Sequence, residues 1–216
     1  MYTTLHRDAV LNVMRATTLT AFTPFVGLIK GITDFRAGTV TEAAYTGYGT
    51  RPSATFSAPA ATSPAGGREI ANSAIVTLPL NTGANEDSFA FGVWDAATAG
   101  NLRGIGFLDA DVPLFGIGDP TAEDIYSAAH GLQTDQRVFV LAAPGAVIPA
   151  GLVENTAYFV LAVGLTADNF RLAATSGGAA INITARGAAL FMPYKAVTVA
   201  TNATPEFAVN TLKLQI

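Results

Sequence analysis

The chain of 216 residues contains no cysteine, only two histidines and few charged side chains. Without cysteine, neither a disulfide nor a thiolate metal site can form, and the redox compartment cannot be inferred. The lysines and arginines are scattered singly from Arg7 to Lys213, so the sequence offers no basic patch for nucleic acid. With two imidazoles, a zinc site made of histidines alone is impossible within one copy.

The sequence also lacks an apolar run long enough for a transmembrane helix. The longest uncharged stretch, residues 138–153, is shorter than a bilayer requires and contains Pro144 and Pro149. We interpret it as strand, loop and strand, and we expect no membrane partner. The first ten residues lack the apolar core of a signal peptide, so we expect no export by that route.

Scarcity of charge predicts contact with other protein surfaces. Charged residues make up 13% of the chain, whereas 50% of its residues are apolar and the formal net charge is −4. A protein that stays monomeric usually has a surface rich in charged residues of both signs. We therefore expect a homo-oligomer, with a trimer as the preferred form.

One segment near the start has the periodicity of an amphipathic helix, at about residues 4–17 of "TTLHRDAVLNVMRATT". Thr3 or Thr4 can serve as N-cap. Such a helix has one apolar face, which must pack against another part of the protein or against another protein. We expect assembly contacts from this face and from the apolar C-terminal strand, namely Leu5, Val10, Val13, Met14, Leu212, Leu214 and Ile216.

The remaining sequence alternates short apolar segments with turn residues, a pattern typical of an all-β sandwich or barrel. We expect strands at "FVGLI", "ATFSA", "SAIVTLPL", "FAFGVWD" and "LRGIGFL", then a second set at "RVFVL", "TAYFVLAV", "NFRLAA" and "AINIT". The closing segment returns to the first pattern. We therefore predict a sandwich-like host domain at residues 1–116 and 193–216, interrupted by a small inserted β domain at 117–192.

His130 follows Ala129 and precedes Gly131, just before an apolar run. A catalytic histidine needs a nucleophile, an orienting carboxylate or metal-binding partners. Three interpretations stay open: catalysis with Asp135 or Glu123, a metal shared between subunits, and a structural turn, which we favour. We predict no catalytic residue and no cofactor.

A second group of polar candidates consists of five acidic residues where the inserted domain begins: Asp109, Asp111, Asp119, Glu123 and Asp124. Their oxygens would suit calcium, but their spacing matches no EF-hand loop and Pro113 and Pro120 interrupt it. We favour a solvated linker over a metal site.

Three aromatic residues are candidate ligand or interface residues: Tyr45, Tyr48 and Trp94. Strand alternation places Trp94 either in the core or on a surface where a sugar could stack. If the two tyrosines are exposed, they serve equally well as sugar contacts or as interface residues.

The order of several segments resembles a known family. "LNVMRATTLTAFTPFVGLIKG", "YTGYGTRPSATFSAP", "IANSAIVTLPL", "FAFGVWDAATAGNLRGIGFL" and "VTVATNATPEFAVNTLKLQI" are similar to segments of small virion proteins of tailed bacteriophages, often labelled tail-fibre proteins. "HGLQTDQRVFVL" and the segments after it resemble a recurrent phage module with a His-Gly-Leu turn. The host domain departs from the usual pattern of this family after Val-Gly-Leu, where this chain has "IKGITDFRAG". The simplest relatives lack the insert.

The resemblance implies a structural, non-enzymatic protein on the particle surface, in the virion and made in the host cytoplasm. Its expected partners are copies of itself and other proteins of the capsid or tail, in the manner of a head decoration or cement protein or a tail fibre. The alternative is a receptor-binding or carbohydrate-binding tail module that contacts a host surface glycan. For His130, the resemblance implies a place in the turn of the module.

Overall fold

A computed structural model describes residues 8, 11, 21–61, 68–108, 113–143 and 145–215. Apart from Asp8 and Leu11, these residues form β-strands joined by turns and loops, which confirms the predicted all-β class. The chain divides into two units: unit 1 comprises Met1–Leu108 and Ala196–Ile216, and unit 2 comprises Asp109–Lys195. The described part of the chain holds no helix of the length and apolarity needed to cross a membrane.

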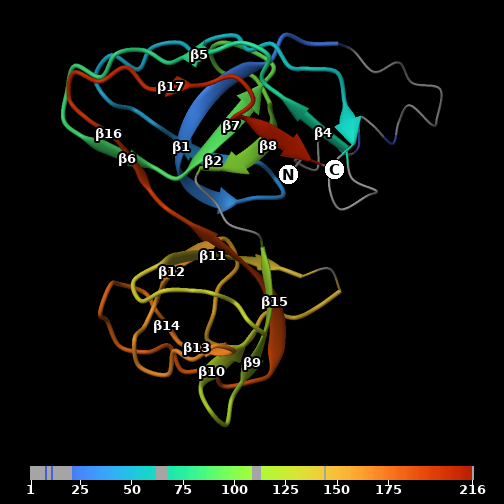
Figure 1. Cartoon of the computed structure of the whole chain (residues 1–216), viewed down its shortest axis with the longest axis vertical. Helices are drawn as coiled ribbons and strands as arrows, with labels where there is room; N and C mark the ends of the chain where they lie inside the picture. The colour runs from blue at the N-terminus through green and yellow to red at the C-terminus, as the bar shows by residue number, and fades with distance from the viewer. Residues whose placement is uncertain are drawn as a thin grey trace. The chain divides into compact units, whose positions relative to one another are not determined.

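Unit 1 is built around a four-stranded antiparallel sheet in the order β2-β1-β7-β8 (Figure 1). The strand Phe25–Asp34, an inner strand of this sheet, has apolar residues at most positions. It is buried along much of its length, because an inner strand packs on both faces. The strands of this sheet are β1 (Phe25–Asp34), β2 (Thr39–Glu42), β7 (Ala90–Trp94) and β8 (Leu102–Phe107).

The C-terminal segment of unit 1 runs antiparallel to residues 69–88 along three short ladders. Val197 pairs with Ser88, Glu206 with Thr77, and Lys213 with Ala71. The sheets are β16-β6, β17-β5 and β18-β4-β3. Their strands are β3 (Ala60–Ala61), β4 (Arg68–Ala71), β5 (Val76–Thr77), β6 (Glu86–Ser88), β16 (Val197–Val199), β17 (Glu206–Phe207) and β18 (Lys213–Gln215).

Two fully buried asparagines hold this returning segment in place. The Asn72 amide donates to the carbonyls of Ala74 and Ala208, and its Oδ1 accepts from the Leu212 N–H. Asn81 donates to the carbonyl of Val199. Buried amides are tolerated when their donors and acceptors are paired, so both side chains stabilise the join between the two halves of unit 1.

Unit 2 is one seven-stranded antiparallel sheet in the order β13-β10-β9-β15-β11-β12-β14. It encloses an apolar core that includes Val138, Phe170 and Phe191, each with none of its surface exposed. The strands are β9 (Leu114–Asp119), β10 (Asp124–Tyr126), β11 (Arg137–Ala142), β12 (Thr156–Val160), β13 (Asn169–Phe170), β14 (Leu172–Ala173) and β15 (Gly187–Tyr194).

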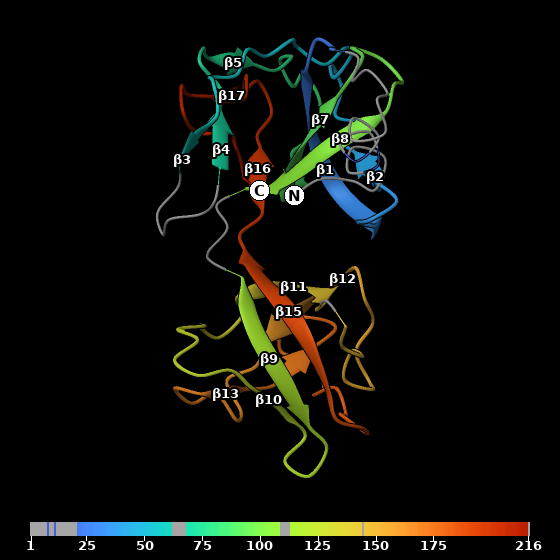
Figure 2. The ribbon, with the colours of Figure 1, turned by 90° about the vertical axis from the view of Figure 1, so that its right-hand side faces the viewer.

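The boundaries of unit 2 differ by a few residues from those expected from the sequence, because the expected boundaries fall inside two strands that pair with each other. β9 and β15 run side by side as the first and last strands of unit 2 (Figure 2), and Leu190 pairs with Phe115. Boundaries after residues 116 and 192 would cut through both strands. The structure instead leaves and re-enters unit 1 at residues 108 and 196.

Some predicted strands are absent among the described residues. "ATFSA" contributes an isolated bridge at Phe56, and "AINIT" contributes one at Ala180. "NFRLAA" is split into β13 and β14, because Arg171 between them leaves the ladder. The apolar residues of these segments do not by themselves supply a neighbouring strand for every backbone group.

Most of the predicted helix at residues 4–17 lies outside the described residues. Asp8 and Leu11 are described, and both have helical backbone and exposed side chains. The candidate contacts Leu5, Val10, Val13, Met14 and Ile216 also lie outside the described part. Leu212 and Leu214 lie in a core cluster of unit 1 and are 1% and 4% exposed, so their side chains are already packed within the chain.

Candidate functional site

Arg51 and Glu42 form a bidentate ion pair in unit 1. The guanidinium of Arg51 donates from Nε to Oε1 of Glu42 at 2.7 Å and from Nη2 to Oε2 at 2.6 Å. Arg51 is 9% exposed. Its Nη1 donates to the carbonyls of Ala96 and Ala99, at 3.0 and 2.7 Å. A planar guanidinium is suited to this geometry because it presents several donors in a rigid fork.

The Trp94 indole lies against this ion pair. The Arg51 guanidinium carbon stands 4.1 Å from the centre of the indole, a cation–π contact. Gly27 of β1 and Gly92 of β7 are paired across the sheet. A Cβ at either position would collide with the indole ring or with Tyr48 and Glu42. The two glycines therefore provide the space in which Trp94 packs.

Tyr48 completes this group, which we call the Arg51 cluster: Gly27, Glu42, Tyr48, Arg51 and Trp94. The Tyr48 hydroxyl donates to Oε1 of Glu42 at 2.5 Å and accepts from the Leu28 N–H. Burial raises the pKa of the Tyr48 phenol, and the hydrogen bond to Glu42 and the charge of Glu42 raise it further. The phenol is therefore held neutral.

Tyr45 lies beside this cluster and is also turned inward. Its ring contacts that of Tyr48 edge to face, with 5.0 Å between centres, and its hydroxyl donates to the Pro79 carbonyl. Tyr45 is 5% exposed and Trp94 is 4% exposed, and Tyr48 is half-buried. Tyr45 and Trp94 therefore lie in the interior of unit 1, which for Trp94 is the core position that strand alternation allowed, and Tyr48 is part-buried beside them. The three residues form no exposed platform on which a sugar could stack.

Hydrogen bonds to Asp95 stabilise the turn that follows Trp94. Asp95 accepts from the Asn101 backbone at 2.6 Å and from Arg103 at 2.6 Å. Burial raises the pKa of Asp95, but the hydrogen bonds from Asn101 and Arg103 outweigh it, and the net shift is downward. Ala99 and Gly100 take positive φ angles, as a tight turn requires.

These contacts join segments far apart in sequence, and they are the segments that resemble phage virion proteins. The sequence matches the family described as Podophage GP4 fiber I protein gp80 over residues 1–115, more than half of the chain. The chain belongs to this family. No curated protein matches it.

The motifs that carry the resemblance to phage fibre proteins meet in the Arg51 cluster. Val-Gly-Leu supplies Gly27, the Gly-Tyr segment before an arginine supplies Tyr48 and Arg51, and the Trp-Asp-Ala turn supplies Trp94. All of these residues lie within the matched range. The match ends inside β9, so the resemblance of the insert to a His-Gly-Leu module stays a prediction.

The buried phenols of the fibre-family part predict a loss of stability at high pH. The pKa of Tyr45 is raised from 10.0 to about 12, first by burial and then by the charge of Glu86, and that of Tyr48 is raised too. A raised phenol pKa gives stability that is complete below pH ~10 and is lost as the pH rises towards the folded value. Urea unfolding at neutral and at high pH measures this loss.

Tyr48→Phe should make this alkaline loss shallower, because one raised phenol is then absent. Tyr126→Phe is the matched control, since Tyr126 is 49% exposed and lies in unit 2. An alkaline loss of equal size in wild type and Tyr48→Phe would show that the phenol of Tyr48 does not contribute.

In unit 2, His130 is a turn residue whose two ring nitrogens are both engaged. Nδ1 accepts from the Leu132 N–H at 2.9 Å, which places the proton on Nε2, 3.3 Å from the Asn169 carbonyl. The ring packs edge to face on Phe170. Ala129 and Gly131 on either side have positive φ angles. In the chain as described, no ring nitrogen is left to bind a metal or to act as a base.

Replacing His130 with alanine should lower the stability of unit 2 by about 1–3 kcal/mol, because the Leu132 N–H would lose its acceptor. His130→Asn should cost less, since asparagine can accept from the N–H two residues ahead. Chemical unfolding followed by circular dichroism measures both. Equal losses for the two variants would contradict the role of Nδ1.

The acidic residues also take structural positions where they are described. Asp119, Glu123 and Asp124 lie in the β9–β10 hairpin, so the linker interpretation is wrong for these three, whereas Asp109 and Asp111 lie outside the described residues. Burial raises the pKa of Asp124, and the charge of Asp119 opposite raises it further. Over the described ranges, no group of three or more acidic or histidine side chains could hold a metal ion.

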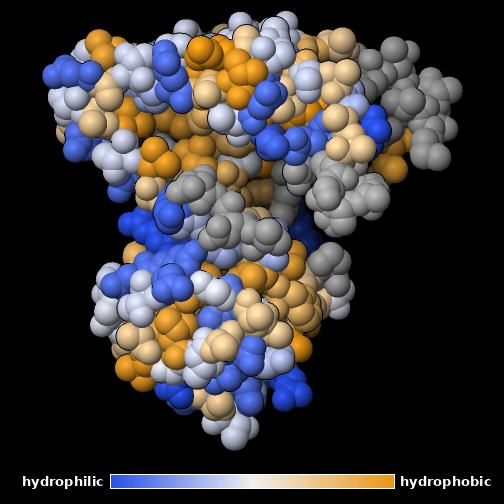
Figure 3. Space-filling view, viewed as in Figure 1, coloured by the Kyte–Doolittle hydropathy of each residue, from blue (hydrophilic) through white to orange (hydrophobic). Residues whose placement is uncertain are grey.

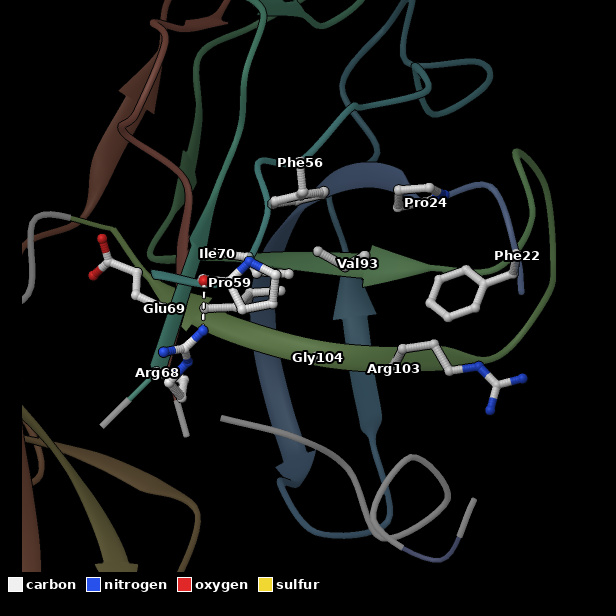
Figure 4. Close-up of a pocket in the computed structure, with 11 residues that line it drawn as sticks. Phe22, Pro24, Phe56, Pro59, Arg68, Glu69, Ile70, Val93, Arg103 and Gly104 are labelled. Atoms are coloured by element: carbon white, nitrogen blue, oxygen red, sulfur yellow. Dashed lines mark hydrogen bonds between the residues drawn. The ribbon is translucent and has the colours of Figure 1, made fainter. Parts of the chain in front are cut away.

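Unit 1 also has a partly open apolar cavity of about 350 Å³ (Figure 4). Phe22 and Arg103 lie side by side at one end, 5.5 Å from guanidinium carbon to ring centre, and Arg68 donates to the Pro59 carbonyl at the other. Sequence reasoning missed this cavity because its walls come from separate segments. They are formed by Phe22, Pro24, Phe56, Pro59, Arg68, Glu69, Ile70, Val93, Arg103, Gly104 and Leu214.

Proposed function

We propose that this protein is a non-enzymatic component of the virion surface that acts by homo-oligomeric assembly, as a trimer. The observation that carries the proposal is the Arg51 cluster. Its charged and aromatic side chains are the residue types that could serve catalysis, yet they bond to one another and to backbone carbonyls. Membership in a phage fibre family, together with a cluster whose polar groups bond within the chain, is consistent with a structural task.

The surface of unit 2 supports assembly more directly. β9 turns its bulky apolar residues outward: Phe115 is 54% and Ile117 is 38% exposed. A Cβ on the intervening Gly116 would collide with core residues, so the inward positions are reserved for glycine. Tyr126 of β10 pairs with Ile117 and is 49% exposed. We call Phe115, Ile117 and Tyr126 the apolar strip.

An outward apolar strip does not stabilise the fold of unit 2, because the core faces the other side of the sheet. Contiguous exposed apolar residues commonly mark a contact with another protein. In Figure 3, apolar residues are interspersed with polar ones over the visible face of each unit. We infer that the strip contributes to contact between copies or with other proteins of the capsid or tail.

Light scattering on the purified chain tests the oligomer. We expect the mass of a trimer, and Ile117→Lys in the strip should shift the mass towards a monomer. Val163→Lys is the control, because Val163 is 71% exposed and lies in another part of unit 2. A monomeric wild-type chain at all concentrations would contradict the proposed assembly.

Antibody labelling of purified particles in the electron microscope tests the location. Label at many equivalent positions on the head would indicate a decoration or cement protein. Label at the tail would indicate a fibre component. Particles without label, from a lysate in which the protein is abundant, would contradict a place in the virion.

The alternative function is a receptor-binding or carbohydrate-binding tail module, which the exposed aromatics of unit 2 support. Tyr126 is exposed and lies two positions along β10 from Asp124, which pairs with Asp119, and an aromatic ring near carboxylates can stack on a sugar and accept from its hydroxyls. A glycan array with wild type and Tyr126→Ala distinguishes the two functions. Binding that Tyr126→Ala abolishes would favour the alternative.

A further inference from the structure

The cavity of unit 1 has an apolar interior of a size that suits a small molecule. Ile70, Val93 and Leu214 line it from three different strands, and Phe22 and Phe56 line it from segments outside the strands (Figure 4). Its volume of about 350 Å³ lies near the lower end of the range of small-molecule sites, about 300–1,000 Å³. Such a cavity favours an apolar occupant over water.

Two of the three charged side chains that line the cavity are already engaged in ion pairs. Arg103 donates to the Asp95 carboxylate at 2.6 Å, and Glu69 accepts from Lys213 at 3.0 Å. Their charges are therefore balanced within the chain. The third charged residue is Arg68.

The guanidinium of Arg68 has donors to spare. Its Nη2 donates to the Pro59 carbonyl at 2.7 Å, and the residue is exposed at one end of the cavity. Within the part of the chain that the structure describes, the side chain makes no further hydrogen bond and no ion pair. Because a guanidinium presents its donors in a planar fork, it is suited to a carboxylate. The cavity thus combines an apolar interior with one group that can receive an anion.

The backbone around the cavity disfavours a peptide as the occupant. Pro24 and Pro59 have no N–H, and their carbonyls already accept from the Ala54 N–H and from Arg68. The strands that line the cavity, β4, β7, β8 and β18, are paired in ladders. A peptide in the cavity would bury N–H and C=O groups with few partners, which costs free energy. An alkyl chain has no such groups.

We propose that the unit 1 cavity binds a single-chain alkyl carboxylate. The alkyl chain packs against Ile70, Val93 and Leu214, and the carboxylate accepts from the guanidinium of Arg68. This goes beyond the proposed virion function and does not depend on it, because the site lies in unit 1 and the apolar strip lies in unit 2.

Calorimetric titration of the full chain with octanoate and decanoate, below their micelle concentrations, tests the apolar part of the site. Decanoate should bind roughly tenfold more tightly than octanoate, because it buries two more methylene groups. Equal affinities, or no binding of either acid, would overturn the proposal. A short apolar peptide with a free C-terminal carboxylate is titrated in parallel. Tighter binding of the peptide than of decanoate would overturn it in favour of a protein partner.

Arg68→Gln tests the anion-binding part of the site. The variant should bind decanoate roughly three- to fivefold more weakly than wild type but bind decanol equally well, because decanol has no charge for the guanidinium to pair with. Arg36→Gln is the matched control, since Arg36 is exposed in the turn between β1 and β2. An equal effect of Arg68→Gln on decanoate and on decanol would contradict the role of the charge.

Photolabelling of the wild-type chain locates the ligand without any substitution. The probe is a decanoate with a diazirine near its methyl end, which loses nitrogen on irradiation and inserts the resulting carbene into a neighbouring C–H bond. Mass spectrometry should find the label on Ile70, Val93 or Leu214, and excess decanoate should suppress it. Label on Phe115 or Ile117 instead would mean that the alkyl chain binds the apolar strip, and would overturn the assignment to the cavity.

Discussion

Replacing Arg51 with alanine is expected to lower the free energy of unfolding of unit 1 by about 3–5 kcal/mol, because it leaves the Glu42 carboxylate largely buried without its partner. The variant also loses the bonds to the Ala96 and Ala99 carbonyls and the contact with the Trp94 ring. Arg51→Lys should lose less, since it keeps the charge, but it cannot reproduce a bidentate pair.

Urea unfolding followed by tryptophan fluorescence measures this loss directly. Trp94 is the one tryptophan of the chain and lies in unit 1, so its emission reports on that unit. Lys213→Ala is the control. Lys213 bonds to Glu69 at 3.0 Å but its side chain is 52% exposed, so the expected change is ~1 kcal/mol or less. An Arg51→Ala loss as small as that of Lys213→Ala would show that the Arg51 cluster does not support the fold.

Replacing Phe191 with alanine is expected to lower the free energy of unfolding of unit 2 by about 3–5 kcal/mol. Phe191 has no exposed surface, and its ring packs edge to face on Phe170 with 5.3 Å between centres. Truncation removes this contact and leaves a cavity in the middle of the core. Phe115→Ala is the matched control on the neighbouring strand, where the side chain is 54% exposed and the loss should be ~0.5 kcal/mol.

The same variant tests whether the two units unfold independently. Among the residues that the structure describes, the core cluster of unit 2 shares no residue with the two core clusters described for unit 1. We therefore expect Phe191→Ala to lower the unfolding transition seen by circular dichroism while the fluorescence transition of Trp94 stays in place. A fall of both transitions together would mean that the units unfold as one cooperative body.

The sequence predicted strands well where apolar residues alternate within a continuous run. "FAFGVWD" and "LRGIGFL" correspond to β7 and β8, and "RVFVL" and "TAYFVLAV" correspond to β11 and β12. β15, the strand between β9 and β11 in the sheet of unit 2, was not predicted from the sequence. Its "GAALFMPY" combines glycine, alanines and proline, which have low strand propensity, and its position depends on two neighbours that flank it.

The candidate site was predicted less well than the strands. Tyr45, Tyr48 and Trp94 were predicted as candidate ligand or interface residues, and burial within the domain was foreseen only as one alternative for Trp94. Glu42 and Arg51 gave no signal as a pair, since nine positions separate them and Glu42 lies in none of the segments that resemble the family. Buried asparagines such as Asn72 also escaped notice, because burial of a polar residue depends on partners elsewhere in the chain.

The sequence by itself determined the all-β class, the scarcity of charge, the exclusion of thiolate chemistry and the membership in a phage fibre family. These properties follow from composition, local periodicity and motif order, which need no knowledge of distant contacts. Only the tertiary structure decided that Trp94 is enclosed between Arg51 and a pair of glycines, that β9 points its phenylalanine outward, and that Asn72 bonds across 136 positions to Ala208. Such contacts depend on strand register, which brings together residues far apart in the chain.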